Sequence, residues 1–208
     1  YFNNPEKRFI ESTLDTVEIF SHSMEMFCLD ETKTFFGEDT EKYNIENYHG
    51  HLRLALSCAM GDEFQETIYK LKDLDAKKIQ ETYKSLQEKY TGNLTDCSEN
   101  EYFLNGDKWM EIDHFFHSPF YLVDYSLAII NALNIYKIYK ADKSKGMEIW
   151  ETLAKNLDNL NYKNITNITP ELQSPFNKQF IAETAQFSIK EMKRLLDEFE
   201  NRSNAESC

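Results

Sequence analysis

The sequence predicts an all-α protein, and three observations support this fold class. The chain of 208 residues contains only six glycines and four prolines, the residues that most often interrupt helices. β-branched residues form few runs, so strands are not favoured. Apolar residues instead recur at the three- and four-residue spacing of amphipathic helices. No repeat and no clear linker divides the sequence, and we therefore expect one helical domain over residues 1–208.

The first half of the chain is expected to hold three long helices. The apolar residues of the first and third of these fall on one broad face, as in helices that pack on a core. Gly37 marks a turn region before the second helix, and Gly61 is expected to loosen that helix. The expected elements are a helix from Pro5 to about Leu29, a turn region over Lys33–Tyr43, a helix over Glu46–Leu71 and an amphipathic helix over Asp75–Tyr90.

The second half is organised around a long apolar helix that is expected to begin at a Ser-Pro step and to end near Ala141. Ser118 suits an N-cap and Pro119 suits the first helical position, where its missing N–H leaves no bond unmade. Such a helix places Tyr121 and Tyr125 on one face, just after His114. The other expected elements are a loop over Gly92–Asn100, short helices over Glu101–Leu104 and Lys108–His114, a helix over Ser144–Asn156, a polar segment over Asn159–Ser174 and a last helix over Pro175–Arg202.

Composition excludes several classes of partner. The formal net charge of −13 and the pI near 4.9 argue against nucleic acid and against an anionic membrane surface. No apolar run approaches the roughly 18 residues of a membrane span. The chain begins at Tyr1 with neither an initiator methionine nor a signal peptide, which indicates a piece of a longer protein. The cysteines are widely spaced and form no CxxC pair, which predicts reduced thiols and a cytoplasmic location. They are Cys28, Cys58, Cys97 and Cys208.

The sequence contains no glycine-rich nucleotide loop, no GxSxG elbow and no HExxH motif. The remaining candidates for a metal site are its histidines and carboxylates. His49-Gly50-His51 is interpreted as an exposed, incidental pair rather than a metal site. The spacing of His114 and His117 can place both on one face; it fits either a shared site or two hydrogen-bonded core histidines.

A second candidate is a polar stripe on the first helix. Glu18 and Glu25 lie seven residues apart and so share one line of the helix, with His22 between them. The stripe can be a solvated face, or it can carry a metal ligand and the carboxylate that supports it.

Read together, these motifs resemble those of a known family. Val17 to Phe27 is similar to the segment of oligoendopeptidase F-type zinc peptidases, relatives of thimet oligopeptidase and neurolysin, that supplies the third zinc ligand. The strongest match is Trp109 to Tyr125, which keeps the family's order and spacing. The resemblance runs from about Val17 to Leu196, and the order of its motifs is specific. Shorter similar segments are Phe36–Asp39, Lys42-Tyr43, Asp62–Gln65, Leu86–Tyr90 and Ser174–Phe176.

The resemblance implies a role for each candidate residue. Glu18 corresponds to the glutamate that binds Zn²⁺, and Glu25 to an acidic residue that supports the metal site. His114 corresponds to a histidine that contacts the peptide near the scissile bond. Tyr121 and Tyr125 match tyrosines that hydrogen-bond the substrate or the tetrahedral intermediate. We expect Glu18 to share a concave surface with His114 and Tyr125.

Three departures from the family pattern accompany the resemblance. The HExxH helix, with two zinc ligands and the general base, must precede Tyr1. Phe20 stands where a polar residue is common and Leu122 where a tyrosine is usual. Asn159 to Tyr162 replaces a glycine-rich turn, which affects how substrate is gripped.

The sequence therefore predicts the C-terminal part of a zinc-dependent oligoendopeptidase. Short peptides would be its substrates, and the missing N-terminal part of the same protein its partner. By itself the chain is expected to be inactive and to lack bound Zn²⁺. The alternative is a non-catalytic helical peptide-binding or scaffold module that has lost the metal site.

Overall fold

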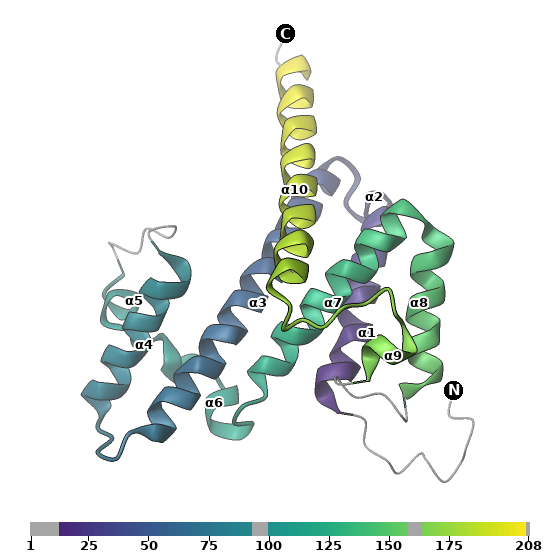
Figure 1. Cartoon of the computed structure of the whole chain (residues 1–208). Coiled ribbons are helices and arrows are strands. Elements are labelled where there is room, and N and C mark those ends of the chain that lie inside the picture. The colour runs from purple at the N-terminus through teal and green to yellow at the C-terminus, as the bar shows by residue number, and fades with distance from the viewer. Residues whose placement is uncertain (1–12, 93–99, 158–163, 207–208) are drawn as a thin grey trace. The chain divides into compact units, whose positions relative to one another are not determined.

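The computed structural model describes residues 13–92, 100–157 and 164–206, and it confirms the all-α prediction. Helices and short connections make up these residues, and none of them lies in a strand (Figure 1). Within the same ranges, no helix combines the length and the apolar composition that a membrane span requires. The α-helices are α1 (Leu14–Phe27), α2 (Thr32–Phe36), α3 (Thr40–Lys70), α4 (Ala76–Thr91), α5 (Glu101–Asn105), α6 (His114–His117), α7 (Leu122–Ala141), α8 (Lys143–Lys155), α9 (Ile165–Ile168) and α10 (Lys178–Glu206).

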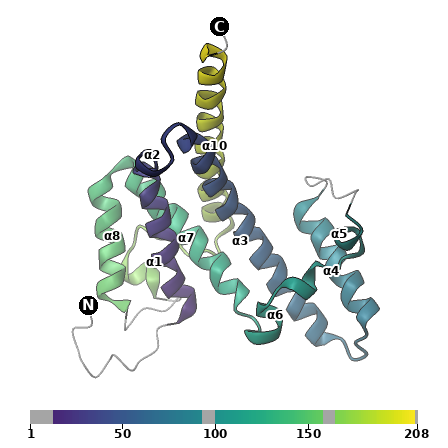
Figure 2. The same cartoon turned by 180° about the vertical axis from the view of Figure 1, so that it is seen from behind.

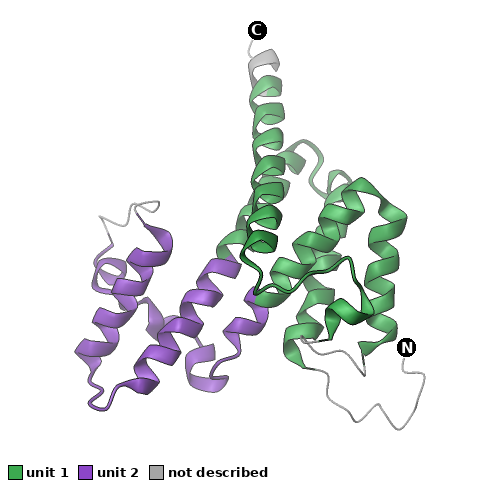
Figure 3. Cartoon of the chain, viewed as in Figure 1, with its two compact units in different colours: residues 1–53, 127–208 green, residues 54–126 purple. Residues whose placement is uncertain are grey.

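The chain divides into two compact units (Figure 3). The first comprises residues 1–53 and 127–208, and the second comprises residues 54–126. α3 and α7 each contribute residues to both units. Whether the whole chain behaves as one domain stays a prediction.

In the first unit, α1 packs against α7 and α8, as both whole-chain views show (Figures 1 and 2). The ring of Phe20 meets Trp150 of α8 edge-on at a centroid distance of 5.6 Å. Phe27 packs on Tyr139 of α7 with 4.5 Å between ring centroids. These aromatic contacts hold α1 against both helices, and they lie on the side of α1 that also buries Ile19 and Met26.

The first unit also joins α10 to the start of α3. The Arg202 guanidinium binds the Glu41 carboxylate at 2.8 Å and donates to the Glu38 carbonyl at 2.8 Å. This two-point contact suits the planar guanidinium, and it anchors the last helix far along its length.

A partly buried carboxylate, that of Asp30, ties the segment after α1 to the junction of α7 and α8. Asp30 lies 2.5 Å from Lys143 and 3.4 Å from Lys140. Burial acts to raise the pKa of Asp30, but the hydrogen bond to Lys143 and the charge of Lys140 outweigh it and hold the pKa below its usual value.

We expect Asp30→Asn to lower the free energy of unfolding at pH 7 by about 1–2 kcal/mol. Because the carboxylate binds its proton less readily in the folded chain, its contribution is present above the unfolded pKa of about 4 and is lost as pH falls through the folded value. Melting curves of the two proteins should therefore converge in acid. Asp39→Asn, which breaks an exposed pair with Lys42, is the control and should leave the melting temperature nearly unchanged. A gap between wild type and Asp30→Asn that persists in acid would contradict the assignment.

The second unit is built on an aromatic core between α3, α4 and the segment leading to α7. Phe64 of α3 meets Tyr83 of α4 at 5.1 Å and Phe115 of α6 at 5.0 Å between ring centroids. Asp75 caps α4 by accepting a hydrogen bond from the Lys78 amide. The buried cluster consists of Cys58, Met60, Phe64, Tyr83, Leu86, Phe115 and Leu122.

Gly61 does not loosen α3, so this prediction is wrong. The helix runs without a break through it. A Cβ at this position would lie 2.5 Å from Leu122 Cδ1 and 3.3 Å from Phe115, so glycine is needed for close packing inside the core.

The predicted start of α7 is also wrong. The helix begins at Leu122 rather than at Pro119, and Phe120 adopts a left-handed conformation with φ 63°. The Phe120 N–H donates to the buried Gln65 side chain at 3.0 Å, which holds the chain in a turn at this point. A distant residue therefore overrides the local capping signal of Ser118.

Most remaining boundaries agree with the sequence prediction to within a few residues, and the larger differences lie near Gly37 and between Lys108 and His114. The region expected to turn around Gly37 holds α2 and a 3-10 turn, and α3 begins at Thr40, six residues before the expected start. The expected helix over Lys108–His114 is instead a 3-10 turn over Lys108–Glu111 followed by the separate helix α6. The predicted start at Pro5 and most of the Gly92–Asn100 loop lie outside the described residues.

Candidate functional site

The polar stripe of α1 carries the predicted zinc ligand. Glu18 is partly buried, and its carboxylate accepts a hydrogen bond from Ser21 Oγ at 3.2 Å. One turn later, His22 is only 8% exposed, whereas the Glu25 side chain is 58% exposed. The stripe is therefore not a uniformly solvated face, because its central histidine is buried.

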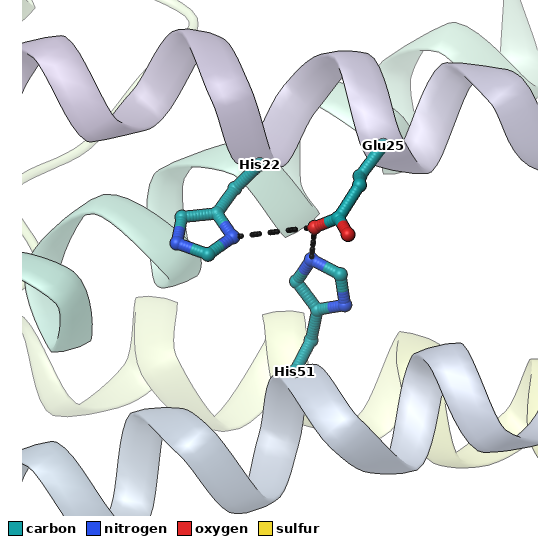
Figure 4. Close-up of side chains that lie close together, drawn as sticks. All are labelled: His22, Glu25 and His51. Atoms are coloured by element: carbon teal, nitrogen blue, oxygen red, sulfur yellow. Dashed lines mark ion pairs between the residues drawn. The ribbon is translucent and has the colours of Figure 1, made fainter.

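His51 of α3 meets this stripe, and the interpretation of His49 and His51 as an exposed, incidental pair is wrong for His51. Figure 4 shows His22, Glu25 and His51 converging from the two helices. Glu25 Oε2 lies 3.3 Å from His51 Nε2 and 3.7 Å from His22 Nδ1. The two imidazole rings meet edge-on with centroids 5.3 Å apart.

The difference between the two histidines follows from helix geometry. Two positions along an α-helix correspond to a rotation of about 200° about its axis, so the two side chains lie on nearly opposite faces. The His51 residue is 6% exposed, while the His49 side chain is 57% exposed and pairs with Glu46.

Burial sets the charge state of His22. Desolvation lowers the pKa of His22, and the neighbouring His51 lowers it further, while the carboxylates of Glu25 and Glu18 act in the opposite direction. The net direction is downward, which favours a neutral imidazole at physiological pH.

The second group of candidate residues lies in the unit formed by residues 54–126. His114, Tyr121 and Tyr125 form an aromatic cluster and are all partly buried. Ring centroids are 5.5 Å apart for His114 and Tyr121, and 5.8 Å apart for His114 and Tyr125. The two tyrosine rings are 4.8 Å apart. The structure thus brings together three residues that the sequence placed near one another.

The core of this unit positions the cluster. Phe115 directly follows His114 and is buried against Phe64, which fixes α6. Ser126 directly follows Tyr125 and donates from its hydroxyl to the Ala55 carbonyl at 2.9 Å, which ties the first turn of α7 to α3. Rigid support on both sides is what a substrate-contacting cluster needs.

His117 does not join this cluster. Its Nδ1 lies 2.5 Å from Asp113 Oδ1, and its side chain is 74% exposed. Both predicted alternatives for His114 and His117, a shared site and a pair in the core, therefore fail for His117.

The family assignment rests on comparison with known proteins. The sequence profile of peptidase family M3 matches residues 4–186. The chain belongs to this family. Solved structures with a similar fold include an X-ray structure at 3.1 Å assigned as oligoendopeptidase F, and PZ peptidase A with an inhibitor. Each has 25% sequence identity and a TM-score of 0.83, and each alignment covers 93% of this chain.

The chain spans about a third of the length of the solved structures that it matches, since the alignments cover 34% of those proteins. No curated protein sequence matches the chain at a significant level. The family match confirms the resemblance inferred from the motifs.

M3 peptidases are generally zinc-dependent, and the donor set of this chain fits part of a zinc site. A catalytic zinc ion normally has three protein ligands and one open position. The sequence resemblance predicts that this chain supplies one of the three, Glu18, and its partly buried carboxylate is a suitable oxygen ligand. Glu18 and Glu25 belong to the first unit, and the His114 cluster belongs to the second. That they share one concave surface stays a prediction.

Proposed function

We propose that this chain is the C-terminal part of a zinc-dependent oligoendopeptidase that hydrolyses short peptides. The match of residues 4–186 to peptidase family M3 carries the proposal. The grouping of His114, Tyr121 and Tyr125 supports it, because the family resemblance predicts these three residues to act together.

In the proposed enzyme, Glu18 is the third zinc ligand and Glu25 supports the metal site. The zinc ion, when bound, would lower the pKa of a coordinated water and so provide a nucleophile near neutral pH. Two histidines and a general-base glutamate would come from an HExxH segment that precedes Tyr1.

The second unit would handle the substrate. His114 would contact the peptide next to the scissile bond and orient its carbonyl. The phenol of Tyr125 would donate a hydrogen bond to the oxyanion that develops on this carbonyl, since a tyrosine O–H remains a donor near pH 7. Tyr121 would hold the peptide by a similar bond. Substrate orientation and oxyanion stabilisation are therefore the tasks that we assign to this chain.

The cytoplasm is the proposed location. Of the four cysteines, the structure describes Cys28 and Cys58, and both are free thiols. Burial raises the pKa of the Cys58 thiol to about 12, so this cysteine stays protonated near pH 7 and is a poor nucleophile. Unpaired thiols are typical of a reducing compartment.

We expect the isolated 208-residue chain to show no metal-dependent cleavage of a bradykinin-like fluorogenic peptide, because it lacks the HExxH general base. The full-length protein should cleave the same peptide, and Glu18→Gln in that protein should abolish turnover and the retention of the catalytic zinc ion. Peptide cleavage and metal analysis on the same preparations measure the two effects.

Cleavage by the isolated chain would contradict the proposal that two zinc ligands and the general base come from an upstream segment. An encoded protein without HExxH that binds peptides but never cleaves them would favour the non-catalytic peptide-binding alternative.

A further inference from the structure

We propose that His22, Glu25 and His51 form a binding site for a divalent transition-metal ion, of which Zn²⁺ is the best match. One potential ligand atom from each of the three residues lies within 4.8 Å of the other two. The proposal makes Glu25 a direct ligand, whereas the family resemblance gives it only a supporting role. It concerns this chain alone and does not depend on the proposed peptidase function.

The hydrogen bond of His51 prepares its other nitrogen for a metal. His51 Nδ1 lies 2.9 Å from the Asn47 carbonyl oxygen. A carbonyl can only accept, so Nδ1 must carry the proton, and in the neutral ring the lone pair is then on Nε2. Metal-binding histidines are commonly oriented in this way by a backbone carbonyl on the opposite nitrogen.

That lone pair faces a carboxylate rather than a donor. His51 Nε2 is buried, makes no hydrogen bond and lies 3.3 Å from Glu25 Oε2. Two acceptors at this distance repel each other unless a cation or a proton lies between them. The geometry therefore calls for a positive species at the centre of the trio.

The spacing suits a tetrahedral ion. Ligand atoms about 2.0–2.1 Å from a tetrahedral Zn²⁺ lie about 3.4 Å from one another. The distances from Glu25 Oε2 to the two histidine nitrogens are 3.3 Å and 3.7 Å. The ligand atoms of the three residues all lie within 4.8 Å of one another, so a bound ion would draw them closer together.

The donor set and the burial pattern select the kind of ion. Two imidazoles and one carboxylate are ligands of Zn²⁺ and of neighbouring transition metals, whereas Ca²⁺ and Mg²⁺ prefer oxygen alone. The histidines are buried, while Glu25 is 58% exposed and gives an ion a path from solvent. A bound ion would link α1 to α3 and fix the helix that carries Glu18.

The test uses the purified 208-residue chain after removal of metals with a chelator. Calorimetry with Zn²⁺ measures affinity, and the visible spectrum of added Co²⁺ reports tetrahedral nitrogen and oxygen ligands. We expect one tight site per chain. At free Zn²⁺ about 100 times Kd, the melting temperature should rise by roughly 5–10 °C.

Variants identify the ligands. Glu25→Gln keeps the shape of an exposed side chain and should therefore leave the fold intact. It should weaken Zn²⁺ binding by more than the roughly 10- to 100-fold that loss of an outer partner costs. His51→Ala should do the same, and His49→Ala, on the opposite face of α3, is the matched control and should bind like wild type.

Four outcomes would overturn the proposal. The first is wild-type Zn²⁺ affinity in a folded Glu25→Gln protein. The second is a loss in His49→Ala as large as that in His51→Ala. The third is a Co²⁺ spectrum with the near-ultraviolet bands of thiolate ligands, because the ion would then be held by cysteines. The fourth is the absence of any Zn²⁺ binding by the metal-free chain.

Discussion

Replacing Tyr125 by phenylalanine in the full-length peptidase is expected to lower kcat by about a hundred- to a thousand-fold. The substitution keeps the ring that packs at 4.8 Å from Tyr121 and 5.8 Å from His114, and it removes only the hydroxyl. A donor aimed at a developing oxyanion strengthens its bond in the transition state, so the effect should fall on kcat rather than on KM. Steady-state kinetics with a fluorogenic peptide measure both constants.

Tyr121→Phe is the matched control for this experiment, because it removes the same hydroxyl from the adjacent ring. Tyr121 comes just before α7 and is expected to place the substrate, so its variant should raise KM or lower kcat only modestly. If both hydroxyls only satisfy neighbouring polar groups, each variant would lose about 1 kcal/mol of stability and keep its kcat. An unchanged kcat with a lower melting temperature in Tyr125→Phe would therefore refute its catalytic role.

Local signals predicted the helices whose ends depend on local chemistry. Asp75 precedes an amphipathic run, and it caps α4 where the sequence placed the start of that helix. The predicted start of α7 is wrong although Ser118-Pro119 is as good a local start signal as Asp75. The hydrogen bond from Phe120 N–H to the Gln65 side chain holds this segment in a turn instead. These two residues are 55 positions apart, and no capping rule contains that information.

The same limit explains why the candidate site was only half found. The grouping of His114, Tyr121 and Tyr125 follows from their closeness in sequence. His51 was missed because its burial depends on where α3 begins and which face it turns inward. One signal was available: His51 falls on the stripe of Tyr48, Ala55 and Cys58, which recur at helical spacing and are all buried. Its meeting with Glu25, however, requires the packing of α1 against α3.

Gly146→Ala is expected to destabilise the first unit by about 3 kcal/mol or more. A Cβ on Gly146 would lie 2.5 Å from both Cα and Cβ of Tyr139 and 2.9 Å from its backbone nitrogen. The Cα and the nitrogen are backbone atoms of the preceding helix, so α8 would have to move away from α7. Such a loss should lower the melting temperature by roughly 6–12 °C, measured by circular dichroism.

Gly50→Ala is the matched control, because it makes the same substitution inside a helix where nothing lies within 4 Å of the new Cβ. Alanine is the better helix former by about 1 kcal/mol, so this variant should melt a few degrees higher than wild type. The two variants thus share one chemical change and are expected to shift stability in opposite directions. A Gly146→Ala protein that melts at or above the wild-type temperature would show that α7 and α8 do not approach as closely as Gly146 and Tyr139 require.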